Sequence, residues 1–129
     1  MQRDPNLSIP SLLWQMLLRE LHRRTGEHHE SGAFLLGHSD ERERRVEKFV
    51  YYDELDPHAY ETGIVILHAA SFGPLWNLCR SSGLSVVADI HVHPQTAFQS
   101  LADRNNPMIA VPGHLALIVP YFARPPTAL

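Results

Sequence analysis

Two histidines are the residues whose type and spacing point most directly to chemistry. His91 and His93 end a strongly apolar run and are followed at once by Pro94. Side chains two positions apart in a strand point to the same face of a sheet, so the two imidazoles can converge on one ion. Proline cannot continue the hydrogen-bond ladder of a central strand, so the pair is expected at a strand end. Because histidine is the commonest metal ligand, the spacing favours a metal site.

A serine and an aspartate follow the histidines at a spacing that can complete such a site. Ser100 and Asp103 are three positions apart, so they share one face of a short helix. Two neutral imidazoles and one carboxylate form a three-ligand zinc set that leaves a fourth position open, as catalytic zinc sites do. A purely structural interpretation stays open as well, in which Ser100 and Asp103 cap a helix and the histidines lie on a solvated face.

Glu30 is the candidate for the base that a hydrolytic zinc requires. It immediately precedes an apolar segment, residues 31–37, that ends in glycine. Zinc lowers the pKa of a bound water to about 7 and makes it a nucleophile at neutral pH, and a nearby carboxylate can then accept the proton. The alternative is a solvated glutamate at the edge of a strand.

The composition is that of an ordinary globular domain with a surplus of histidine. The chain has 129 residues, of which 44% are hydrophobic and 19% charged, with a formal net charge of −3 and nine histidines. This length supports one domain over residues 1–129. The charge argues against nucleic acid binding, and no apolar run could span a membrane. A single cysteine excludes a disulfide framework, and the polar N-terminus is unlike a signal peptide, so a cytoplasmic protein is expected.

The periodicity of apolar residues predicts alternating helices and strands. Leucines recur at every fourth position within residues 11–25, which indicates an amphipathic helix that Gly26 ends. The expected strands are residues 33–36, 46–52, 64–67, 84–92 and 115–119, and the other expected helices are residues 72–82 and 100–105. A turn at 38–45, a loop at 53–63 and a loose tail at 120–129 are expected between and after them. This order indicates an α/β domain with a mixed β-sheet flanked by helices.

Taken together, the candidate residues resemble the JAMM (MPN+) metalloprotease motif. Glu30 precedes an apolar strand that ends in glycine, and His91-Val92-His93-Pro94, Ser100 and Asp103 follow far downstream in the order of that family. The resemblance covers roughly residues 7–121. It implies a cytidine-deaminase-like JAMM/MPN fold, in which a mixed sheet lies between helices.

The resemblance also implies a role for each of the five motif residues. His91, His93 and Asp103 would bind one zinc ion. Glu30 would take a proton from the zinc-bound water and pass it to the leaving amine. Ser100 would donate a hydrogen bond to the oxyanion of the tetrahedral intermediate, beside zinc acting as a Lewis acid.

The implied activity is that of a zinc-dependent isopeptidase or peptidase that cleaves after the C-terminus of a ubiquitin-like protein. Residues 95–98 are similar to a loop of AMSH-type deubiquitinases. The small size resembles minimal prokaryotic members, whose partners include the activating and conjugating enzymes of the same system. A sulfur-carrier-protein processing peptidase and a non-catalytic MPN scaffold are the alternatives. A zinc deaminase of the related fold would need a cysteine pair, which a single cysteine cannot supply.

The sequence departs from the family pattern in three ways. Six residues separate His93 from Ser100, where the family usually has seven. Asp89 stands where many members carry an aromatic residue, and it could support a metal ligand, add negative charge near the metal or face solvent. The long insertions of eukaryotic deubiquitinases are missing, so short loops or partners must grip the substrate.

Five further side chains have two possible interpretations each. Tyr51, Tyr52 and Tyr60 flank the acidic segment 53–61 and could form a substrate-facing rim or simply pack. His114 could face the site or play a structural role at the start of the last strand. Cys79 is interpreted as a buried helix residue rather than a nucleophile, because no polar site is evident around it.

Overall fold

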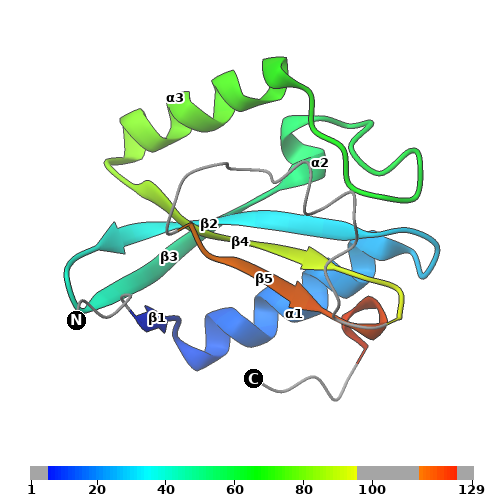
Figure 1. Ribbon diagram of the computed structural model, residues 1–129, viewed down its shortest axis with the longest axis horizontal. Coiled ribbons are helices and arrows are strands. Elements are labelled where there is room, and N and C mark those ends of the chain that lie inside the picture. The colour runs from blue at the N-terminus through cyan, green and yellow to red at the C-terminus, as the bar shows by residue number, and fades with distance from the viewer. Residues whose placement is uncertain (1–5, 96–113, 125–129) are drawn as a thin grey trace.

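The protein folds around one mixed sheet that has helices on both faces. The computed structural model describes residues 6–95 and 114–124, and the structural statements below concern that part of the chain. Figure 1 shows α1 on one side of the sheet and α2 and α3 on the other. The elements in chain order are β1 (Asn6–Ser8), α1 (Ser11–Thr25), β2 (Ser31–Ser39), β3 (Glu43–Tyr51), α2 (Tyr52–Leu55), η1 (Ala69–Ser71), α3 (Phe72–Ser82), β4 (Ser85–Val92), β5 (Ala116–Val119) and η2 (Tyr121–Ala123).

Strand β2 is the centre of the sheet, whose order is β1-β3-β2-β4-β5. It pairs antiparallel with β3 on one side and with β4 on the other. The short strand β1 adds to β3 in parallel, and β5 adds to β4 in parallel. The prediction of a mixed sheet flanked by helices is therefore confirmed.

Helices α1 and α3 begin and end where the sequence predicts. Leu17 and Leu21 of the α1 leucine stripe are fully inaccessible, whereas Leu13 is half-buried. Gly26 and Gly83 end the two helices in the left-handed conformation, with φ of 56° and 70°, which glycine adopts without steric cost. Neither helix, nor any other in the described residues, has the length and apolar character needed to cross a bilayer.

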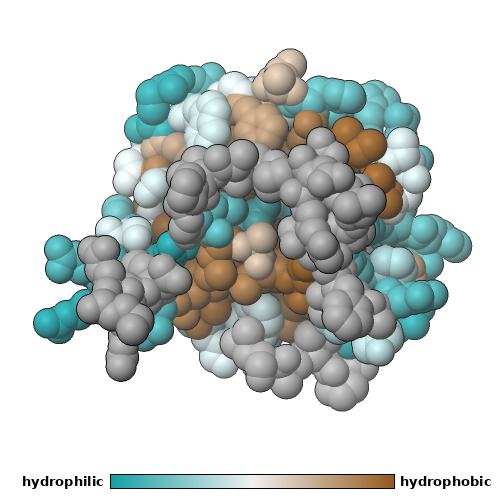
Figure 2. Space-filling model, viewed as in Figure 1, coloured by the Kyte–Doolittle hydropathy of each residue, from teal (hydrophilic) through white to brown (hydrophobic). Residues whose placement is uncertain are grey.

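Each face of the sheet has its own hydrophobic core. The core beneath α1 is formed by Leu17, Leu18, Leu21, Ala33, Leu35, Val46, Val87, Ala88, Ile90, Val92, Val119 and Ala123. The core beneath α2 and α3 is formed by Phe34, Leu36, Val50, Tyr52, Ala59, Tyr60 and Leu75. Figure 2 shows hydrophobic residues gathered in the middle of the visible face, with hydrophilic residues along its left and right margins. Successive residues of β2 serve opposite cores, as strand alternation requires. In β4 the consecutive residues Val87 and Ala88 both belong to the core beneath α1, at the point where the register with β2 shifts.

The hairpin between β2 and β3 is longer than predicted. The charged residues 38–45 were expected to form a turn, but β2 continues to Ser39 and β3 begins at Glu43. The actual turn is residues 40–42, where the Asp40 carboxylate accepts the backbone N–H groups of Arg42 and Glu43, both at 2.8 Å. The prediction is wrong because exposed antiparallel arms tolerate polar residues on both faces, so charge does not interrupt pairing.

The expected strand at residues 64–67 is also wrong. Exposure alternates along this segment. Ile64 and Ile66 are exposed, whereas Val65 and Leu67 pack against the core beneath α2 and α3. The segment joins no sheet, because its backbone bonds go elsewhere. The Ile66 N–H donates to the Ala59 carbonyl at 3.0 Å, and the Val65 N–H donates to a side chain described below. Period-two burial therefore arises here without a strand partner.

Gly37 lies where β2 bulges, and a larger residue is expected to break the sheet locally. The registers of β2 with β3 and with β4 shift between residues 35 and 37, and a Cβ on Gly37 would overlap the Arg45 carbonyl oxygen. Because that obstacle is backbone, Gly37→Ala is expected to lower the free energy of unfolding by about 3 kcal/mol, the upper range of over-packing. Chemical denaturation measures the change. Gly73→Ala in α3 is the matched control, since a Cβ there meets no atom within 4 Å and should leave stability equal or higher. Equal stability of the two variants would contradict the bulge as the cause.

Candidate metal centre

Glu30, His91 and His93 meet at one end of the sheet. Glu30 immediately precedes β2. His91 is the second-to-last residue of β4, and His93 directly follows that strand. Antiparallel pairing sets Gly32 opposite His91, which brings the start of β2 beside the end of β4. One potential ligand atom from each of the three side chains lies within 4.8 Å of the other two. The sequence prediction that these residues converge is confirmed.

The Glu30 carboxylate is buried and held in place. Its side chain keeps little solvent exposure, and the whole residue is 8% exposed. The Val65 N–H donates to Oε1 at 3.1 Å, while Oε2 lies 3.6 Å from Nε2 of His93. The Glu30 N–H donates to the Gly63 carbonyl at 2.9 Å. The interpretation of Glu30 as a solvated strand-edge residue is therefore wrong, and hydrogen bonds to Gly63 and Val65 position it.

The backbone of His93 is fixed by the segment that follows β5. Its N–H donates to the Val119 carbonyl, and its own carbonyl accepts from the Phe122 N–H, both at 2.9 Å. Tyr121, Phe122 and Ala123 have φ of 56–58°, so three residues with side chains form a left-handed turn. Such a conformation costs about 1–2 kcal/mol per residue and persists only where its surroundings hold it.

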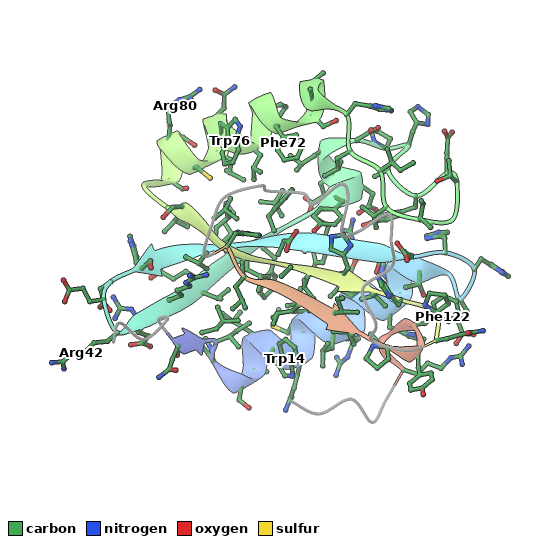
Figure 3. The ribbon with its side chains drawn as sticks, in the orientation of Figure 1. Trp14, Arg42, Phe72, Trp76, Arg80 and Phe122 are labelled. Atoms are coloured by element: carbon green, nitrogen blue, oxygen red, sulfur yellow. The ribbon has the colours of Figure 1, made fainter. Side chains whose placement is uncertain are left out.

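This turn corrects the expectation of a loose tail that begins at residue 120. Phe122 lies beside the C-terminal end of α1 (Figure 3), where its carbonyl accepts a hydrogen bond from His22 Nδ1 at 2.9 Å. Arg124 pairs with Glu27 at 2.7 Å. A loose tail can therefore begin only after residue 124. These contacts join residues that are far apart along the chain, so no local pattern in the sequence indicates them.

Asp89 lies beside the cluster and is almost completely buried, at 2% exposure. The Tyr52 hydroxyl donates to its Oδ2 at 3.1 Å, and His91 Nε2 lies 3.6 Å from the same oxygen. His114 Nε2 lies 3.3 Å from Oδ1. Burial raises the pKa of Asp89, but hydrogen bonds and positive charge from His114 and His91 outweigh it and lower the pKa to about 2. The solvent-facing interpretation of Asp89 is wrong, and His114 faces this carboxylate.

Tyr52 and Tyr60 pack in the interior rather than forming a rim, and the half-buried Tyr51 packs beneath the Arg24 guanidinium, which lies 4.1 Å from the Tyr51 ring centroid. Tyr52 is fully buried, with its ring edge-on to Phe34 and to His91 at centroid distances of 4.8 and 5.4 Å. Tyr60 donates from its hydroxyl to Asp53 at 3.0 Å, and burial raises its pKa. Cys79 is half-buried in α3, where burial raises the thiol pKa and so disfavours the reactive thiolate.

The donors brought together suit a transition metal of the zinc type. Imidazole and carboxylate are both common zinc ligands, and the three donors are close enough to bind one ion. Glu30 can act either as a third ligand or as a base beside an ion that His91 and His93 hold. Ser100 and Asp103, the other two predicted site residues, lie outside the described residues, as does the helix predicted at 100–105.

Comparisons with known proteins support the fold but do not identify a family. No family model matches the sequence. The chain is similar to the solution structure of protein DSY2949 from Desulfitobacterium hafniense, a structural-genomics target, with a TM-score of 0.56 and 19% identity. The match covers 80% of this chain and 68% of that one. At this identity the similarity concerns the α/β fold alone.

Proposed function

We propose that this chain is a zinc-dependent isopeptidase or peptidase of the JAMM/MPN type, which cleaves after the C-terminus of a ubiquitin-like protein. The observation that carries the proposal is that Glu30, His91 and His93 are buried and lie close enough to bind one ion. Glu30 is far in sequence from the two histidines, and the three residues stand in the order of the JAMM motif. A buried carboxylate beside two histidines has a cost in desolvation that a bound cation would offset.

In the proposed reaction each residue of this chain has a defined task. His91, His93 and Asp103 would hold one zinc ion, which would supply a Lewis acid and lower the pKa of water toward neutral pH. Glu30 accepts a proton from the attacking water and delivers it to the leaving amine. Since Oε1 accepts the Val65 N–H, Oε2 on the His93 side is the oxygen that exchanges protons. Ser100 donates a hydrogen bond to the oxyanion.

The surroundings of Glu30 suit an extended peptide tail. Residues 64–68 belong to no sheet, and the segment contacts the Glu30 carboxylate through the Val65 N–H. Ile64 and Ile66 are 46% and 39% exposed, so apolar side chains line the outer side of this segment. The N–H groups of Val65 and Ile66 already have acceptors within the chain, so a substrate tail is expected to pack apolar side chains against the two isoleucines. Activating and conjugating enzymes of the same system are the proposed cellular partners.

Cleavage of defined fusion proteins tests the proposal. The zinc-loaded chain is incubated with ubiquitin-like proteins and with sulfur-carrier proteins, each extended beyond its C-terminus, and the products are identified by mass spectrometry. Cleavage of the ubiquitin-like fusion at the junction is expected, and removal of zinc by a chelator should abolish it. Cleavage of the sulfur-carrier fusion alone would assign the chain to precursor processing.

A non-catalytic MPN scaffold is the second candidate. The observation that favours it is the loop of six residues between His93 and Ser100, one fewer than is usual in the family the sequence resembles. A chain that binds no zinc and cleaves none of these fusions would fit the scaffold and overturn the enzyme.

A further inference from the structure

We propose that Asp89 is a positioning residue, which orients His91 as a metal ligand with the help of Tyr52 and His114. The inference rests on the metal site of the proposed function but not on its substrate or its reaction. Asp89 stands at a position where the resembled family often has an aromatic residue, so the role would be particular to this chain.

The side chains of Tyr52, His114 and His91 converge on the buried carboxylate of Asp89. Asp89 precedes His91 by two residues in β4, so strand alternation sets both on the sheet face that carries α2 and α3. Tyr52 reaches it from the start of α2, and His114 from the segment before β5. Contacts from separate elements fix the carboxylate on several sides, and its Oδ2 lies 3.6 Å from His91 Nε2.

A neighbouring carboxylate can orient an imidazole ring for metal binding. A ring that gives one nitrogen to a carboxylate directs the other away from it, and metal-bound histidines are commonly oriented by such a partner. One side of His91 faces Asp89, while a ligand atom of His91 also lies within the Glu30–His93 cluster. The Tyr52 ring packs edge-on against the imidazole at 5.4 Å and restricts its rotation. The same tyrosine thus holds both the carboxylate and the ring that the carboxylate orients.

Asp89→Asn tests this role, because it keeps the size of the side chain and removes its charge. Zinc affinity, measured by competition with a chelator, is expected to fall about 10- to 100-fold. The visible spectrum of the Co²⁺-substituted protein should shift as well, because the geometry at the ion changes. A purely structural role of Asp89 would lower the melting temperature of the metal-free protein but leave the Co²⁺ spectrum unchanged.

Asp53→Asn is the matched control. Asp53 is a partly buried aspartate that pairs with Arg24 at 2.8 Å and accepts a hydrogen bond from Tyr60 at 3.0 Å. Its replacement should lower stability without changing zinc affinity. Equal zinc affinity and equal Co²⁺ spectra of Asp89→Asn and the parent protein would overturn the inference, and the metal site would stand. A parent protein that binds no zinc would overturn both.

A second variant tests the positioning role of Asp89 if Asp89→Asn fails to fold. Tyr52→Phe removes only the hydroxyl that donates to Asp89 and keeps the ring against His91 and Phe34. A several-fold loss of zinc affinity is expected, smaller than that of Asp89→Asn. Unchanged affinity and an unchanged Co²⁺ spectrum in Tyr52→Phe would then contradict the positioning role.

Discussion

A Glu30→Gln variant is expected to retain zinc and to lose peptidase activity. Glutamine keeps the size of the side chain and an acceptor oxygen for the Val65 N–H, so the local fold should survive. It cannot accept a proton from water near neutral pH. Loss of a positioned general base typically costs about 10²- to 10⁴-fold in rate. Turnover of a ubiquitin-like fusion and zinc content per chain are measured on the same preparation.

Both measurements are needed, because the geometry allows Glu30 two roles. Loss of zinc together with activity would identify Glu30 as a ligand, since its carboxylate lies within the same 4.8 Å cluster as the histidines. Asp103→Asn is the informative companion: the proposed ligand set requires it to lose zinc, whereas a site of Glu30, His91 and His93 would keep the ion. Glu27→Gln, an exposed glutamate paired with Arg124, is the control and should retain both zinc and activity. Unchanged turnover in Glu30→Gln would overturn the proposed base.

The parts of the fold that the sequence predicts well are those determined by neighbouring residues. Helices α1 and α3 follow from leucine periodicity and from glycines in the left-handed conformation at their ends. Strand β4 is recognised by its β-branched run, although it begins at Ser85 rather than at residue 84. All these signals lie within a few positions of the element that they define.

The errors arise where partners are distant in sequence. Residues 64–67 are a short run of aliphatic residues, which is typical of a strand, but the Val65 N–H bonds to the Glu30 carboxylate instead of a neighbouring strand. The short strand β1 owes its existence to parallel pairing with β3, and its three residues carry no signal of their own. The left-handed turn at 121–123 is likewise formed by contacts with His93 and α1.

The candidate site also combines contacts that the sequence predicts with contacts that depend on distant segments. The order of the motif residues predicts that Glu30 meets the two histidines, and the structure confirms it. Alternation along β4 also sets Asp89 on the face of His91. Nothing in the sequence around His114 indicates that it reaches Asp89, because that contact depends on how the segment before β5 returns to the sheet. The roles of Ser100 and Asp103 stay predictions from the resemblance.

Replacing His91 by alanine is expected to abolish zinc binding and, with it, the stabilisation that zinc provides. A ligand present at 100 times its dissociation constant stabilises a protein by about 2.7 kcal/mol, which raises the melting temperature by several degrees in a domain of this size. The parent protein should show that rise on addition of zinc, and His91→Ala should show none. Metal analysis should give about one zinc per chain in the parent and none in the variant.

The readout must be the zinc-dependent shift rather than the melting temperature itself. His91→Ala also removes one of the groups that face the buried Asp89 carboxylate, and the loss of such a partner costs about 1–3 kcal/mol without any metal. The metal-free variant should therefore melt below the metal-free parent. His58→Ala, an exposed histidine paired with Glu61, should match the parent in both states. A full zinc-dependent shift in His91→Ala would show that the ion binds elsewhere, and the proposed metal centre would then be wrong.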